Sequence, residues 1–224
     1  DKDFQFAWKQ GNEMTYYGGT LNAQKLTTDN KEIDGYFGTL AENAKMRVPQ
    51  TGFYHVFLDF CKASELPGGP QIVVVPVVFG VRGAMNGWGY TEAEAPQVVA
   101  GQKEITWQWK DQEISLAGGE FKFAHSDCWK IHLDSAELVK ANSNLGGNLE
   151  GEEVNDLVPN GANIKVDKAG YYDITLTYTL AKGEMKNSFK AVVKLTREQD
   201  LPTEAYMTGS AFGNWVWGSD GVAK

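Results

Sequence analysis

The chain of 224 residues has few cysteines, which leaves little chemistry for a thiolate metal site. Its two cysteines, Cys61 and Cys128, stand far apart, with no Cys-x-x-Cys pair and no cluster of cysteine and histidine. Structural zinc sites need several such ligands at close sequence spacing. A zinc site is therefore not expected, whereas a disulfide between the two cysteines stays open.

Positive charge and long apolar runs are also scarce. Lys and Arg total 21 against 29 Asp and Glu, the net charge is −8, and no basic block stands out. Because nucleic-acid binding needs a positive face that neutralises phosphates, no nucleic-acid partner is expected, and an anionic membrane surface is disfavoured for the same reason. No apolar run approaches the about 18 residues that indicate a membrane span.

Aromatic residues and glycines, by contrast, are abundant: Phe, Trp and Tyr make up 12% of the chain, which also has 25 Gly. Several segments alternate apolar and polar residues with the period of a strand that has one buried face. Gly, Asn and Asp clusters typical of turns separate them. We therefore predict an all-β fold of immunoglobulin-like β-sandwich type. The clearest apolar alternations are Tyr54, Val56, Leu58 and Phe60; Tyr172, Ile174, Leu176, Tyr178 and Leu180; and Phe189, Ala191, Val193 and Leu195.

Segments of the chain echo each other at a spacing near 120 residues. "DFQFA" near the start resembles "EFKFA", with 117 residues between Phe4 and Phe121. "AKMRVPQTGFYHVFLDF" resembles "NIKVDKAGYYDITLTYTL", and "VRGAMNGW" resembles "MTGSAFGNW". This period exceeds that of solenoid repeats and matches a small β-domain, so it predicts tandem homologous modules.

The echoes divide the chain into three parts. Residues 75–197 are predicted to form a complete module, which we name the central part. Residues 1–74, the first part, are predicted to be a module without its opening strand, and residues 198–224 a linker with the opening strand of a further module. Two accounts fit this division: the chain is a fragment of a longer repeat protein, or its last segment completes a first module in a neighbouring chain.

Three residues of the central part do not fit a simple core. Lys122 stands between Phe121 and Phe123, so it lies on the outer face of a strand whose phenylalanines point inward. Trp88 and Trp129 lie in or beside loops. Singly, each residue fits a solvated lysine or a loop tryptophan that caps the sandwich. Together they predict a surface site where two indole planes stack on sugar rings and an ammonium group meets a hydroxyl.

The other aromatic residues are mainly predicted to be core. Trp107 and Trp109 share one face of an alternating run with Ile105. His125 is predicted to be a polar loop residue near the proposed site, and His132 an ordinary surface or half-buried residue. Neither histidine has an acid or nucleophile partner that the sequence reveals.

The order of a tryptophan after a Gly-rich turn, a lysine between aromatics and a second tryptophan resembles starch-binding modules of the β-sandwich type. In such modules the tryptophans stack on glucose rings and the lysine donates a hydrogen bond to a hydroxyl. The resemblance therefore implicates Trp88, Lys122 and Trp129, with the adjacent Tyr90 and Lys130 as further candidates for glycan binding.

The wider pattern is similar to the SusE/SusF family of surface starch-binding lipoproteins of Bacteroidetes. Their tandem modules carry blocks much like "GEFKFA", "CW", "NIKV" and "GYYDI" in this chain. The resemblance covers the central part well and the flanks partly. It implies non-catalytic binding of starch-type α-glucan at the cell surface, on the outer membrane, with a lipid anchor in a segment outside this chain. Other outer-membrane glycan-uptake proteins are the further partners that it implies.

The flanking parts depart from this pattern. In the first part Gln5 stands at the position of Lys122, Trp8 follows closely, and the opening tryptophan is missing. An intact site is therefore not expected there. In the last segment Trp215 corresponds to Trp88, but the residues that would complete its site do not follow.

No enzymatic signature is present. Glycoside hydrolysis needs two carboxylates across a cleft, whereas Glu152, Glu153 and Asp156 share a polar loop in which solvated acids are ordinary. Calcium binding by that loop stays open, although its spacing matches no EF-hand. Nucleophile-elbow, phosphate-loop and zinc-protease motifs are absent, so neither catalysis nor a cofactor is expected. Two alternatives remain: a structural or adhesive surface protein with β-sandwich modules and no glycan site, and an accessory fragment of a hydrolase.

Overall fold

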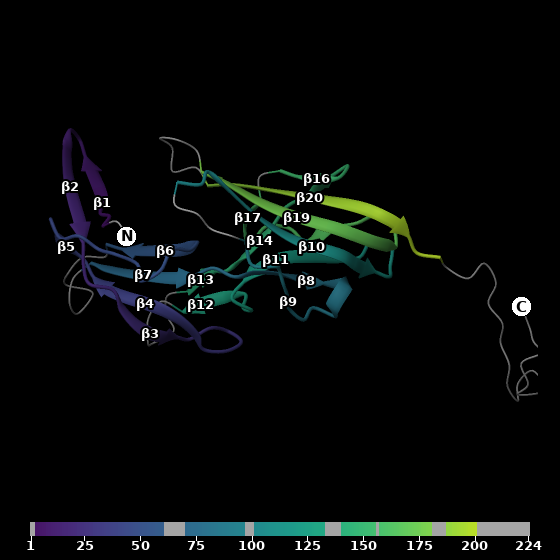
Figure 1. Cartoon of the computed structure of the whole chain (residues 1–224), viewed down its shortest axis with the longest axis horizontal. Coiled ribbons are helices and arrows are strands. Elements are labelled where there is room, and N and C mark those ends of the chain that lie inside the picture. Colours follow the sequence, from purple (N-terminus) through teal and green to yellow (C-terminus); the bar gives the residue numbers. More distant parts are fainter. Residues whose placement is uncertain are drawn as a thin grey trace, which may run out of the picture.

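The computed structural model describes residues 3–60, 70–96, 101–132, 140–155, 157–180 and 187–200. Over these ranges the chain is almost entirely antiparallel β-structure, and its one helical element is the short 3-10 turn η1 (Ala84–Asn86) (Figure 1). The prediction of an all-β fold is thereby confirmed, while the finer prediction of tandem immunoglobulin-like modules stays a prediction. The described ranges hold no helix long and apolar enough to span a membrane. Cys61 and Trp215 lie outside these ranges.

The first part forms two antiparallel sheets at one end of the molecule (Figure 1). One has the order β1-β2-β5, with strands β1 (Phe6–Gln10), β2 (Glu13–Gly18) and β5 (Ala41–Glu42). The other has the order β3-β4-β7-β6, with strands β3 (Asn22–Leu26), β4 (Ile33–Thr39), β6 (Tyr54–Asp59) and β7 (Gln71–Pro76).

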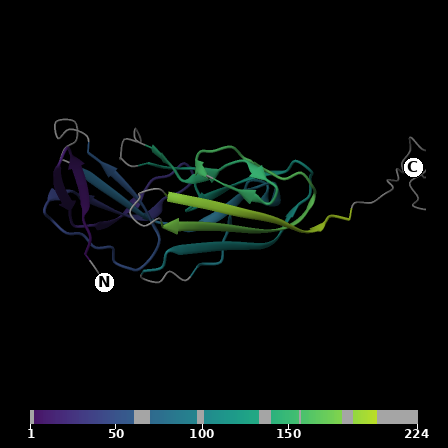
Figure 2. The same ribbon diagram turned by 90° about the horizontal axis from the view of Figure 1, so that it is seen from above.

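The central part forms two larger sheets that enclose the main apolar core (Figures 1 and 2). One sheet, which carries Trp107 and Trp109, has the order β10-β19-β20-β16-β15. Its strands are β10 (Glu104–Ile114), β15 (Leu149–Glu150), β16 (Glu153–Val154), β19 (Gly170–Leu180) and β20 (Asn187–Glu198). The facing sheet is β17-β14-β11-β8-β9, with strands β8 (Phe79–Gly83), β9 (Thr91–Glu92), β11 (Glu120–His125), β14 (Asn144–Gly146) and β17 (Val158–Pro159), and with β18 (Ile164–Lys165) paired to β11. A separate pair joins β12 (Lys130–His132) and β13 (Lys140–Asn142).

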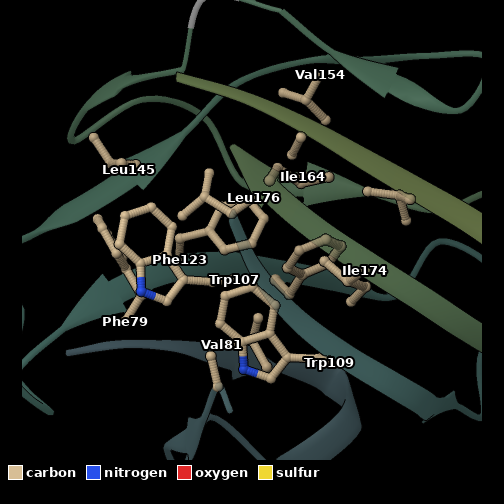
Figure 3. Packing of buried hydrophobic residues seen from close by; sticks show 14 of the residues in the cluster. Phe79, Val81, Trp107, Trp109, Phe123, Leu145, Val154, Ile164, Ile174 and Leu176 are labelled. Atoms are coloured by element: carbon tan, nitrogen blue, oxygen red, sulfur yellow. The ribbon is translucent and has the colours of Figure 1, made fainter. Parts of the chain in front are cut away.

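Alternation along the strands determines which side chains enter this core. Ile174 and Leu176 of β19 are buried, as is Val193 of β20, while their polar neighbours face outward. Trp107 and Trp109 of β10 are only 2% and 3% exposed, which confirms their predicted place in the core (Figure 3). Because each residue alternates with a solvated one, each strand presents one apolar face to the opposite sheet.

The first and central parts are packed together. The predicted boundary between residues 74 and 75 falls inside β7, and two residues separate the end of β7 from the start of β8. Phe53 packs against Trp107 with ring centroids 5.2 Å apart. A second apolar cluster takes residues from both parts: Leu26, Ile33, Val73, Val75, Cys128 and Ile131. The two parts therefore share apolar contacts as well as chain connectivity.

Three positions differ from the sequence-based expectation. His125 is the last residue of β11, not a loop residue, and is 4% exposed; its Nε2 lies 3.1 Å from Nδ1 of His55. Burial lowers the pKa of His125 to about 3, with a contribution from His55, whose own pKa burial lowers to about 4. His132 is likewise buried. In β6 the predicted inward residue Leu58 is exposed, because this strand lies between two apolar clusters and Phe57 packs on the second.

Candidate functional site

The candidate site begins on the outer face of the β8–β11 pair. In this antiparallel register Arg82 lies directly opposite Lys122, and the next pair along is Val81 with Phe123. Val81 and Phe123 are fully buried in the core. Because neighbouring residues in a strand point to opposite faces, Arg82 and Lys122 lie side by side on the face turned away from the core.

Trp88 is held in an unusual backbone conformation just beyond β8. The side chain of Asn86 fixes the turn, since its Oδ1 accepts the Gly83 N–H at 3.0 Å and its Nδ2 donates to the Val81 carbonyl at 2.9 Å. The Trp88 N–H donates to the Gly83 carbonyl at 2.9 Å. Trp88 has φ 65°, a left-handed value that bulky residues rarely adopt, and its side chain is 41% exposed. Such strain at an exposed aromatic is a common mark of a functional position.

Trp129 reaches the same place from the loop between β11 and β12. Ser126 and Asp127 in this loop both have positive φ, the left-handed conformation typical of a tight turn. The rings of Trp88 and Trp129 lie 6.2 Å apart between centroids, with 51° between their planes. The structure therefore brings together the two tryptophans that the sequence singled out, and the pair is named the indole platform below.

Arg82, which the sequence analysis missed, connects both halves of the indole platform. Its guanidinium carbon lies 4.9 Å from the ring centroid of Trp129 and 5.8 Å from that of Tyr90. It donates to the Trp88 carbonyl at 3.4 Å and to the Asp127 carbonyl at 3.1 Å, and it forms an ion pair with the Asp127 carboxylate. A planar guanidinium suits this task, because it stacks on aromatic faces while its N–H groups bind oxygens in the same plane.

Lys122 is joined to the indole platform through Asn144. The Lys122 ammonium donates to Asn144 Oδ1 at 3.3 Å, and Asn144 Nδ2 donates to the Trp129 carbonyl at 3.2 Å. Asn144 is buried, whereas Lys122 is half-buried. Burial lowers the pKa of Lys122. Since an ammonium has three N–H donors, this contact leaves donors for a ligand at the edge of the platform.

The two further candidates, Tyr90 and Lys130, take different places. The Tyr90 hydroxyl donates to the Val78 carbonyl at 2.7 Å, and burial raises the pKa of this phenol. Its ring faces the Arg82 guanidinium, and its hydroxyl is taken up by the Val78 carbonyl. Lys130 has an exposed side chain beside Trp129 and opens β12.

Asp127 completes the polar support of the site. Lys31 of the first part contacts its carboxylate at 3.0 Å, on the oxygen not used by Arg82. Although burial acts to raise the pKa of Asp127, the hydrogen bonds from Lys31 and Arg82 hold it below its usual value. The carboxylate is therefore ionised near neutral pH and binds cations on both sides.

No known protein family, no curated protein and no solved structure matches this chain. Within the part of the chain that the structure describes, no group of three or more His, Cys, Asp or Glu could hold a metal ion, and Asp156 of the acidic loop lies outside that part.

Proposed function

We propose that the chain binds a glycan without catalysis, through the indole platform and Lys122, and that the ligand is a starch-type α-glucan. One observation carries the proposal: Trp88 and Trp129 form an adjacent, tilted pair with centroids 6.2 Å apart, in which Trp88 is exposed and Trp129 is half-buried. Aromatic rings that serve packing alone are normally covered, as Trp107 and Trp109 are in this molecule.

The geometry fits a curved sugar chain better than a flat one. Each pyranose ring has an apolar C–H face that stacks on an aromatic plane, and its hydroxyls need hydrogen-bond partners at the ring edge. Two planes set 51° apart can each take one of two successive rings of a bent chain. The Lys122 ammonium lies beside them, on the same face of the sheet, and is suited to donate to a hydroxyl.

The rigidity of the site is consistent with binding. A platform fixed before binding loses little conformational entropy when a ligand arrives. Here Arg82 stacks on Trp129 and binds the Trp88 carbonyl, and Asn144 holds the Trp129 carbonyl. The proposed location at the cell surface, with an outer-membrane lipid anchor and glycan-uptake partners, rests on the resemblance to the SusE/SusF family.

Affinity electrophoresis in gels that contain amylopectin tests the proposal. The wild type should be retarded, and Trp88→Ala and Trp129→Ala should each bind about tenfold more weakly, as expected for a central aromatic contact. Trp8→Ala is the matched control, because Trp8 is an exposed tryptophan (51%) of the first part that packs on Phe60 far along the chain from the platform. The Trp8 variant should migrate as the wild type does.

Three results would contradict the proposal. Absence of retardation of the wild type would favour the structural or adhesive alternative, in which the exposed indoles contact protein. Equal retardation of the wild type and both platform variants would place any glycan binding elsewhere. Release of reducing sugar from the gel polysaccharide would contradict the non-catalytic assignment.

A further inference from the structure

The tip of the β3–β4 hairpin, which belongs to the first part, lies against the loop that carries Trp129. Thr28 forms an isolated antiparallel bridge with Ile131, and the His132 N–H donates to the Thr27 carbonyl at 2.9 Å. Beneath this contact the second apolar cluster joins Leu26 at the end of β3 with Ile131. The hairpin tip and the Trp129 loop are therefore packed as one unit, although about 100 residues of chain separate them.

Asp29 at this tip holds the backbone of Trp129 directly. A single carboxylate oxygen, Oδ1, accepts the N–H of Trp129 at 3.0 Å and that of Lys130 at 3.2 Å. On the other side the Trp129 carbonyl accepts from the Ser143 N–H at 3.0 Å and from the Asn144 side chain. Because hydrogen bonds from backbone N–H to a carboxylate are charge-assisted, Asp29 is the strongest of these fixed points.

The next two residues of the tip hold the preceding turn. Asn30 Nδ2 donates to the Asp127 carbonyl at 2.9 Å, and the Lys31 ammonium contacts the Asp127 carboxylate. Asp127 has φ 55°, a conformation that the surrounding contacts must maintain. The side chain of Thr28 organises the tip itself, since its Oγ1 accepts the N–H of Asn30 at 3.1 Å and that of Lys31 at 2.9 Å.

We infer that Asp29 is a positioning residue for Trp129, so that the first part helps to build the glycan site of the central part. The inference rests on the proposed function for its biological meaning. Its structural content is separate: without the Asp29 carboxylate, the backbone amides of Trp129 and Lys130 lose their acceptor and the indole loses its fixed tilt to Trp88. The central part would then carry both tryptophans without a platform.

Circular dichroism of the full chain measures the relative position of the two indoles and needs no ligand. Two indoles at 6.2 Å and a fixed tilt couple their electronic transitions and give an exciton couplet, which Trp88→Phe should abolish and thereby identify. Asp29→Ala should lose most of the couplet and bind amylopectin about tenfold more weakly, as expected when charge-assisted hydrogen bonds are removed. Asp29→Asn keeps an acceptor oxygen and should restore both signals.

Asp34→Ala is the matched control on the same hairpin. Asp34 is exposed and pairs with Lys25 at 2.7 Å, so its loss should leave the couplet and the binding unchanged. Should Asp29→Ala not fold, the double variant Asn30→Ala/Lys31→Met carries the test, because it removes two exposed contacts to Asp127. That variant is expected to weaken the couplet.

The outcomes separate the two proposals. A wild-type couplet in folded Asp29→Ala overturns the positioning role of Asp29. A wild-type couplet in the double variant overturns the wider claim that the hairpin tip of the first part fixes the Trp129 loop. Both conclusions hold whether or not amylopectin binds. A lost couplet that Asp29→Asn restores supports the role even if the wild type ignores amylopectin, in which case the proposed function alone fails.

Discussion

Two tryptophan pairs of the central part occupy opposite environments. Trp107 and Trp109 project from β10 into the core (Figure 3). There the Trp107 and Phe79 rings lie with centroids 4.8 Å apart, and the Trp109 indole N–H donates to the Thr91 carbonyl at 2.9 Å. Trp88 and Trp129 lie over the outer face of the opposite sheet, partly exposed. The inner pair is fixed mainly by apolar packing.

The outer pair is fixed by different forces. Polar contacts to the backbone, through Arg82, Asn144 and Asp29, set the positions of the two loops. Under the proposed function, stability and binding depend on different tryptophans of the central part. Substitutions of the inner pair should act on folding, and substitutions of the outer pair on ligand binding.

Trp107→Ala should have the largest effect. Removing a fully buried indole that contacts Phe53 and Phe79 leaves a large cavity, so the free energy of unfolding should fall by about 3–5 kcal/mol. Urea denaturation measures this loss. Trp88→Ala is the outer counterpart and should change the free energy of unfolding by less than about 1 kcal/mol. Equal losses for both variants would remove the distinction between the two pairs.

The burial of Trp107 and Trp109 could be predicted, because the period-two alternation of a strand is visible in the local sequence. The alternation of Ile105, Trp107 and Trp109 with polar residues follows from strand geometry and needs no knowledge of the partner strand. The alternation in β6 was misleading, since that strand is covered on both faces and Leu58 is the exposed member. His125 was assigned to a loop because the sequence does not reveal that His55 packs on it.

The support of the outer pair could not be predicted from the sequence. Arg82 stands in "FGVRG" and was not singled out, because its place opposite Lys122 depends on the β8–β11 register. Asp29 lies 100 residues from Trp129, and no periodicity connects a hairpin tip with a distant loop. The tryptophans and Lys122 were found through composition and family resemblance, whereas their polar anchors depend on tertiary pairing.

Acid should lower the free energy of unfolding through the His55–His125 pair, which lies on the core side of β11. Both folded-state pKa values, about 4 and about 3, lie below the ordinary histidine value near 6.5, so the folded protein binds fewer protons than the unfolded chain. The stabilisation is complete above pH about 6.5 and is lost as the pH falls toward the folded values. Between pH 6.5 and 5 the loss from the two histidines together should be on the order of 3 kcal/mol, measured by urea denaturation at each pH.

His55→Asn provides the control for this pH dependence. Asparagine does not titrate, so the variant should show a clearly smaller fall in the free energy of unfolding over the same pH interval. An identical fall in wild type and variant would assign the acid sensitivity to other groups. The indole couplet of the outer face should persist while the protein remains folded, because the histidine pair lies on the other side of the strand.

The backbone of Trp88 allows a finer test of the comparison. Since φ is 65° at this position, glycine adopts the native conformation without strain, and Trp88→Gly should be more stable than Trp88→Ala by about 1 kcal/mol. Both variants should lose amylopectin retardation equally. At Trp129, which is not among the positive-φ residues, alanine should instead be at least as stable as glycine. The same order of stability at both positions would contradict a strained Trp88.

Lys122→Met should have the smallest effect on stability and separates charge from packing at the edge of the indole platform. Methionine keeps an apolar stem of similar length, and the lost hydrogen bond to Asn144 is offset because a half-buried ammonium no longer has to be desolvated. The free energy of unfolding should therefore change by less than about 0.5 kcal/mol. Amylopectin retardation should nevertheless weaken, because the donor for a sugar hydroxyl is gone. If Lys122→Met were retarded as strongly as the wild type, the platform would act through its two indole planes alone, and the lysine opposite Arg82 would belong to the solvated surface of the sheet.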